Sequence, residues 1–267
     1  MLKSGLLKKL REEKPLVHCI TNMVVANFQA NGLLAIGASP LMADALEETP
    51  EMAAASSSLV LNIGTLHAST VESMLAAGKS ANQAGIPVVL DPVGAGATAF
   101  RKSVVKQLLN ELDITLIRCN AGELAAIAGA EWRARGVDAG EGDMNIGETA
   151  KKTAKKYGSI VAVTGEKDYV SDGKTVVAIQ NGHPFMPSVT GSGCLLSGVA
   201  GAFLGVANGD SFVAAITSLS IYGAAGELAG AASEGPGDFT VNLLNALHHI
   251  TVDEALLRAK IYEEVLS

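Results

Sequence analysis

A glycine-rich segment at residues 190–194 carries the strongest chemical signal in the sequence. It reads Thr-Gly-Ser-Gly-Cys and leads directly into the apolar stretch 195–207. Two glycines one residue apart let consecutive N–H groups curl around an anion, and a following helix adds its positive end. We therefore predict a nest for a phosphoryl group or an oxyanion. Its candidate catalytic residues are Gly191, Ser192, Gly193 and Cys194. A plain glycine turn before a buried helix is the alternative interpretation.

Two acidic residues are candidates for metal or proton chemistry. Asp91 follows a buried aliphatic run and opens the sequence Asp-Pro-Val-Gly-Ala-Gly, and Glu123 lies three residues after Asn120. A carboxylate at a strand end can hold a water of Mg²⁺ or accept a proton, and residues three apart share a helix face. The alternatives are a turn cap for Asp91 and a capping box for Asn120 and Glu123.

Several familiar motifs are absent. Gly173-Lys174-Thr175 and Gly78-Lys79-Ser80 lack the earlier glycine of a Walker A loop, and neither G-x-G-x-x-G nor G-x-S-x-G occurs. The five histidines include no pair at metal-binding spacing, so we interpret them as structural or surface residues. A classical dinucleotide, P-loop or serine-hydrolase site is therefore disfavoured.

Alternation of short aliphatic runs with longer helical stretches predicts an α/β fold with a mainly parallel sheet covered on both faces. After Val189 the chain is predicted to be almost entirely helical, and Trp132 to Gly142 is the best loop candidate. Composition does not shift along the chain, so residues 1–267 are expected to form a single domain. The predicted strands are 15–20, 58–63, 87–91, 114–118 and 160–164, the helices include 69–84, 100–112 and 145–157, and 168–170 with 175–179 form a hairpin.

Polar residues follow each predicted parallel strand. In open parallel sheets, ligands bind beyond the carboxyl ends of the strands. We therefore expect these polar residues to meet at one edge of the sheet. They are Thr21 and Asn22, Asn62, Asp91, Arg118 to Glu123, and Thr164 to Lys167.

Composition excludes several classes of protein. The 267 residues are 48% hydrophobic and 18% charged with a net charge of −7, which excludes disorder and argues against nucleic-acid binding. Three widely spaced cysteines fit no disulfide framework, and the first 14 residues do not form a signal peptide, so a soluble cytoplasmic protein is expected. The apolar stretches 195–207 and 211–226 are too short to span a membrane, so we predict core helices and no membrane partner.

Six segments, in this order, closely resemble the hydroxyethylthiazole kinase family of the ribokinase-like superfamily. The resemblance covers nearly the whole chain and implies a three-layer α/β/α subunit in a homotrimer. It also implies transfer of the ATP γ-phosphate to the hydroxyl of 4-methyl-5-(2-hydroxyethyl)thiazole, a salvage step in thiamine biosynthesis that requires Mg²⁺. The segments are 20–22 (Ile-Thr-Asn), 37–42 (Gly-Ala-Ser-Pro-Leu-Met), 90–96 (Leu-Asp-Pro-Val-Gly-Ala-Gly), 118–123 (Arg-Cys-Asn-Ala-Gly-Glu), 163–165 (Val-Thr-Gly) and 190–194 (Thr-Gly-Ser-Gly-Cys).

The same resemblance implies roles for individual residues. Asn22, Met42 and Gly191 correspond to the thiazole pocket between subunits, Arg118 and Thr164 to ATP contacts, and Asp91 and Glu123 to the acidic residues around Mg²⁺. Cys194 stands where related kinases place an aspartate base, and a helix N-terminus can lower a thiol pKa. It is either that base or a small residue that shapes the pocket.

Other activities remain open at this point. A hydroxymethylpyrimidine kinase, an ATP-dependent NAD(P)H-hydrate dehydratase and a nucleotide-binding regulator without turnover all suit the same general pattern.

Overall fold

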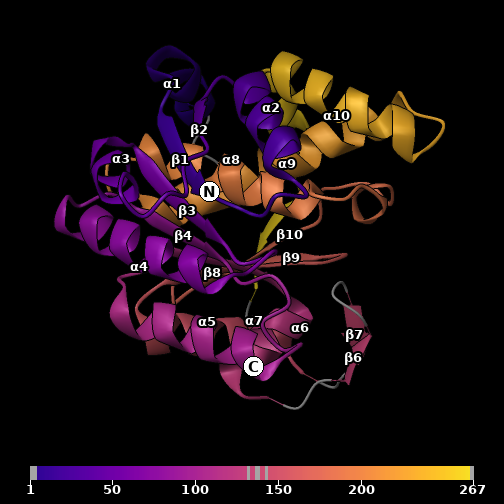
Figure 1. Ribbon diagram of the computed structural model, residues 1–267. Helices are drawn as coiled ribbons and strands as arrows, with labels where there is room; N and C mark the ends of the chain where they lie inside the picture. Colours follow the sequence, from indigo (N-terminus) through magenta and orange to yellow (C-terminus); the bar gives the residue numbers. More distant parts are fainter. Residues whose placement is uncertain (1–4, 131–132, 136–138, 142–143, 265–267) are drawn as a thin grey trace.

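The computed structural model describes residues 5–130, 133–135, 139–141 and 144–264. Their main feature is a nine-stranded sheet with helices around it (Figure 1). The strand order is β11-β10-β9-β8-β5-β4-β3-β1-β2. Strands β2, β1, β3, β4, β5 and β8 are parallel, and β9, β10 and β11 extend the sheet in antiparallel fashion. Their bounds are β1 Leu16–Ile20, β2 Ser39–Leu41, β3 Ser58–Asn62, β4 Val88–Asp91, β5 Leu116–Asn120, β8 Ile160–Thr164, β9 Asp168–Ser171, β10 Val176–Ile179 and β11 Ile261–Glu263.

Helices cover both faces of this sheet, because the strand side chains alternate between two apolar cores. Val60 of β3 belongs to one core, whereas its neighbours Leu59 and Leu61 belong to the other. The first core is closed by α1 (Gly5–Glu13), α2 (Ala26–Ile36), α8 (Ser192–Gly205), α9 (Ser211–Ala231), α10 (Pro236–His249) and α11 (Val252–Arg258). The second is closed by α3 (Thr49–Ala55), α4 (Ala68–Gln83), α5 (Ala99–Glu111), α6 (Ala121–Ala128) and α7 (Ile146–Tyr157). The three-layer α/β/α prediction is confirmed.

The five predicted parallel strands are all present, and the predicted hairpin is the antiparallel pair β9–β10. Strand β2 was not predicted. It has only three residues, one of them Pro40, and such a strand gives no continuous aliphatic run. Proline is tolerated here because β2 lies at an edge of the sheet.

One prediction of secondary structure was wrong, and another needs one addition. The chain after Val189 is almost entirely helical, as predicted, except for β11, which pairs with β10 through Ile179 and Ile261. The predicted loop 132–142 contains a two-stranded hairpin, β6 (Arg133–Arg135) and β7 (Ala139–Glu141). The rest of that loop, residues 132, 136–138 and 142, lies outside the described residues. In both places three-residue strands are too short to show a period in the sequence.

The two apolar helices predicted for the core are α8 and α9. Helix α9 is long and apolar enough to cross a membrane by length and composition, but 78% of that stretch is buried in the fold. Its small residues let it pack closely against α8 and α10.

Candidate active site

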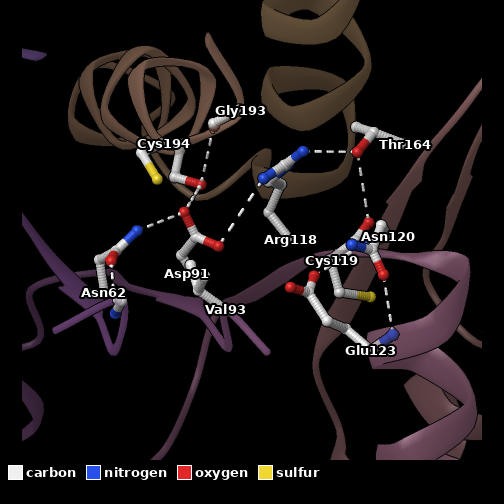
Figure 2. A network of polar contacts seen from close by, with 12 residues as sticks. Asn62, Asp91, Val93, Arg118, Cys119, Asn120, Glu123, Thr164, Gly193 and Cys194 are labelled. Carbon is white, nitrogen blue, oxygen red and sulfur yellow. Dashed lines mark hydrogen bonds and ion pairs between the residues drawn. The ribbon is translucent and has the colours of Figure 1, made fainter. Parts of the chain in front are cut away.

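The polar residues at the strand ends meet at one edge of the sheet. Because β1, β3, β4, β5 and β8 are parallel neighbours, their carboxyl ends lie side by side. Figure 2 shows Asn62, Asp91, Arg118 and Thr164 in one network of contacts below the first turn of α8.

Asp91, the last residue of β4, is the buried centre of this network. Its Oδ2 accepts hydrogen bonds from Asn62 Nδ2 at 2.7 Å and from Ser197 Oγ at 2.9 Å. Among the described residues its Oδ1 has no hydrogen-bond donor, and it lies 3.7 Å from Arg118 Nη1. Burial raises the pKa of Asp91, while the Arg118 charge and side-chain hydrogen bonds, those of Ser197 and Asn62 among them, oppose that rise. One carboxylate oxygen therefore remains available to a bound group.

Arg118 of β5 supplies a fixed positive charge. Its Nη2 donates to Thr164 Oγ1, and its guanidinium packs so closely on α8 that a Cβ at Gly193 would lie 2.9 Å from Nη1. Burial alone would lower the pKa of Arg118, but the carboxylates of Asp91 and Glu123 outweigh it and raise the pKa. A guanidinium beneath the positive end of a helix repels that end unless an anion separates them. The arrangement is thus suited to an anion.

The first turn of α8 has the backbone shape that the glycines predict. Gly191 adopts φ +90, and a Cβ there would lie 2.8 Å from Val25 Cγ1, so only glycine fits. The first N–H groups of a helix have no intrahelical acceptor. The Ser192 N–H is already bonded to Val189 O at 3.2 Å, which leaves the amides of Gly193 and Cys194 for an anion.

Two further hydrogen bonds fix Ser192 at the start of the helix. Its hydroxyl donates to Met186 O at 2.7 Å, and its carbonyl accepts from the Tyr222 hydroxyl at 2.7 Å. The side chain of Ser192 therefore anchors the turn and does not point to an anion as a free donor.

Cys194 lies between Asn22 and Asp91. The amide of Asn22 donates to Sγ at 3.6 Å, and Gln29 Nε2 donates to the Cys194 carbonyl at 2.9 Å. Burial, followed by the charge of Asp91, raises the pKa of the Cys194 thiol to about 12. This direction is opposite to the lowering that a helix N-terminus alone would produce. The group is a neutral thiol at neutral pH.

Glu123 forms the capping box that was one of its two sequence interpretations. Its Oε2 accepts from Asn120 N at 2.8 Å, and Asn120 Oδ1 accepts from Glu123 N at 2.8 Å. Its Oε1 accepts from Gly94 N at 2.9 Å. Burial, with the nearby charge of Asp91, raises the pKa of Glu123 to about 7. The carboxylate therefore braces α6 and the loop after β4 while facing Arg118.

The residues expected to bind the thiazole are only partly joined to this network. Asn22 Nδ2 donates to Asn62 Oδ1 at 2.8 Å, which connects the end of β1 to Asp91. Met42 follows β2 at the same edge of the sheet and is 36% exposed. Among the described residues no hydrogen bond joins Met42 to Gly191.

Sequence reasoning missed two contributors. Ser197 looked like one more small residue of an apolar helix, although a lone hydroxyl one turn after the glycines was the available signal. Asp168 is the first residue of β9, and its Oδ1 accepts a hydrogen bond from Gly165 N at 3.0 Å. Burial raises the pKa of Asp168 to about 7. Its place in a predicted hairpin gave no hint of this burial.

This doubly covered, mainly parallel sheet has the fold of the ribokinase-like class. The fold matches a pyridoxal kinase from Staphylococcus aureus solved with AMP-PCP and pyridoxal, with a TM-score of 0.64 over 94% of this chain and 99% of that one. The sequence identity is 16%, so this likeness concerns the fold alone.

Sequence comparisons define the family. The model of the hydroxyethylthiazole kinase family matches residues 7–253. Hydroxyethylthiazole kinases from Exiguobacterium sp. and Histophilus somni are 53% and 52% identical, over 91% and 98% of this chain and 92% and 100% of theirs. A structure of the hydroxyethylthiazole kinase protein from Pyrococcus horikoshii OT3 matches with a TM-score of 0.90 and 40% identity, over 98% of both chains. The chain belongs to the hydroxyethylthiazole kinase family, as its motifs indicated.

Proposed function

We propose that this protein transfers the γ-phosphoryl group of ATP to the hydroxyl of 4-methyl-5-(2-hydroxyethyl)thiazole, in a salvage step of thiamine biosynthesis. Family membership supports the substrate. The observation that carries the chemistry is the Arg118 guanidinium packed against Gly193, where the free amides of α8 begin.

In the proposed mechanism the protein mainly positions the reactants and neutralises charge. The alcohol oxygen bonds to the γ-phosphorus while the bond to ADP breaks, through a loose transition state, and the hydroxyl proton passes to the transferred phosphoryl group. Arg118 and Thr164 hold phosphate oxygens, and the amides of Gly193 and Cys194 face the transferring group. Such preorganised donors gain strength in a buried site, where water does not compete.

We propose Asp91 and Glu123 as the residues that hold Mg²⁺. The free, buried Oδ1 of Asp91 fits this role, as does the second carboxylate beside the same arginine. Among the described residues no group of three His, Cys, Asp or Glu could enclose a metal ion. That fits Mg²⁺, which is usually held by one or two carboxylates, waters and substrate phosphates. When bound, the ion neutralises phosphate charge.

We further propose a homotrimer in which Asn22, Met42 and Gly191 line a thiazole pocket completed by a neighbouring subunit. Large apolar side chains next to this edge support it, because Met23 and Val24 directly follow Asn22 and are 74% and 66% exposed. Exposed apolar groups beside a binding residue are typical of a surface covered by a partner.

A cytoplasmic location is part of the same proposal. Cys19, Cys119 and Cys194 are all free thiols, as expected in a reducing compartment.

The test is a coupled assay of ADP formation with the hydroxyethylthiazole, with its deoxy analogue as the control. We expect turnover only with the alcohol, and its loss in Asp91→Asn. Phosphorylation of hydroxymethylpyrimidine, or repair of hydrated NADH, in place of thiazole turnover would favour the other ribokinase-like activities. Tight ATP binding without any phosphorylated product would indicate a regulator.

A further inference from the structure

Arg101 connects two loops that leave the candidate site. It lies in the first turn of α5, and its guanidinium donates to three backbone carbonyls. The acceptors are Ile63 O at 2.5 Å and Gly64 O at 2.7 Å, both after β3, and Val93 O at 2.7 Å, after β4. A planar guanidinium presents five N–H donors in a fixed fork, so one side chain can hold both loops.

The position of Arg101 is electrostatically unfavourable in itself. The first turn of a helix carries partial positive charge, and that of α5 contains no acidic residue. Among the described residues no carboxylate pairs with this half-buried guanidinium; its partners there are the three carbonyls. The contact with the two loops is what offsets the unfavourable location.

One peptide group links Arg101 to Glu123. The carbonyl of the peptide between residues 93 and 94 accepts from Arg101, and the N–H of the same peptide donates to Glu123 Oε1 at 2.9 Å. A cation and a carboxylate thus hold opposite ends of one planar unit. The loop that follows Asp91 cannot rotate there without breaking both bonds.

The other loop touches the substrate side of the site. The N–H of Gly64 donates to Asn62 Oδ1 at 2.9 Å, and a Cβ at Gly64 would lie 2.6 Å from Asn22 Nδ2. Backbone held by Arg101 therefore packs directly against Asn22. A shift of this loop would displace the amide pair Asn22–Asn62.

We propose that Arg101 is a positioning residue for phosphoryl transfer, which fixes the loops after β3 and β4 and, through them, Asn22 and Glu123. The role rests on the proposed kinase function. Arg101 contacts backbone only and acts through these other groups.

The chain offers a matched control in Arg11. This arginine is also half-buried and also donates to three backbone carbonyls from two segments, Ile36 O at 3.4 Å, Leu247 O at 3.1 Å and His248 O at 3.0 Å. Those segments are the ends of α2 and α10, outside the network around Asp91. Arg101→Met and Arg11→Met therefore remove the same kind of clamp at different places.

The experiment compares both variants by thermal melting, steady-state kinetics and hydrogen exchange of the ligand-free protein. Both should melt earlier. Arg101→Met should lower kcat/KM for the thiazole by about 10- to 100-fold, the range usual when an outer supporting partner is lost, while Arg11→Met leaves it unchanged. Exchange of the Gly94 amide should be faster only in Arg101→Met.

The outcomes separate this proposal from the proposed function. Equal kinetic losses in both variants, or wild-type kcat/KM together with wild-type Gly94 protection in Arg101→Met, would overturn the positioning role. An inactive wild type would refute the kinase function, while Gly94 exchange would still test the clamp. Should Arg101→Met fail to fold, Arg101→Lys replaces it: a single ammonium cannot reproduce the fork, so slower turnover and faster Gly94 exchange are still expected.

Discussion

The two oxygens of the buried Asp91 carboxylate differ in their hydrogen bonds. Asn62 and Ser197 both donate to Oδ2, so the free lone pairs are on Oδ1, which faces Arg118. A carboxylate held in this way keeps one orientation and cannot turn its saturated oxygen toward the ligand. The neighbours of Asp91, and not its type alone, make it suitable for an ion or a water.

Cys194 is expected to shape the site without removing a proton. With a pKa of about 12, the thiolate fraction at pH 8 is ~1 in 10,000. Cys194→Ala should therefore lower kcat by less than about tenfold, whereas loss of a general base typically costs 10²–10⁴-fold. Steady-state kinetics with saturating ATP and thiazole measure this. Cys19→Ala, which removes a buried thiol from β1, is the control, and a loss above about a hundredfold in Cys194→Ala alone would restore the base role.

At the scale of elements, strands with longer aliphatic runs could be predicted from the sequence, and strands of three residues could not. The runs that became β3 and β8 contain unbroken aliphatic stretches, 59–61 and 160–163, and both strands appear where expected. The strand ends then implied that Asn62 and Thr164 share an edge of the sheet. By contrast, β2 and β11 have three residues each and depend on pairing with a neighbour, which no local pattern reveals.

The residue types of the site could be predicted from the sequence, but the neighbours that each residue contacts could not. Glycines at 191 and 193 indicated a concave turn of backbone N–H groups, but not that Val25 and Arg118 would pack against that turn. No spacing in the sequence could indicate that a helix-start arginine at 101 would reach the loops after two other strands. Such contacts depend on tertiary packing alone.

The start of α8 gives a prediction about one turn of backbone. Gly191→Ala should destabilise the protein more than Gly158→Ala. Both glycines have positive φ, +90 and +65, so alanine costs about 1–2 kcal/mol at either place. Only at Gly191 does the new Cβ also meet a neighbour, Val25, whereas nothing lies within 4 Å at Gly158. Urea unfolding measures the difference.

The same pair of variants distinguishes an effect on the first turn of α8 from a general loss of stability. The contact with Val25 can be relieved by a movement of the first turn of α8, so Gly191→Ala should also lower kcat/KM. Gly158 ends α7, outside the network around Asp91, and its variant should keep wild-type kinetics. Equal unfolding free energies and equal kinetics in the two variants would contradict a role for this turn.

At the scale of the whole molecule, the two edges of the sheet differ. One edge strand is β2, which pairs with β1, the strand that leads to Asn22; the exposed side chains of Met23, Val24, Met42 and Leu46 follow these two strands, whereas the other edge strand is β11. The organisation of residues 1–267 as a single domain stays a prediction, and so does the trimer. The exposed group beside Asn22 allows the trimer to be tested directly.

Met23→Glu should weaken both subunit association and activity. A charge at a 74% exposed apolar position costs little in an isolated subunit, but it must be desolvated when a partner covers it. Sedimentation should show a shift from trimer toward monomer, and specific activity should recover as protein concentration rises, because association is a mass-action equilibrium. Leu257→Glu is the control, since Leu257 is 88% exposed on α11, which leads into the opposite edge strand. A wild-type monomer, or a Met23→Glu trimer with low activity at every concentration, would mean that Met23 acts inside one subunit and that the site does not need a partner there.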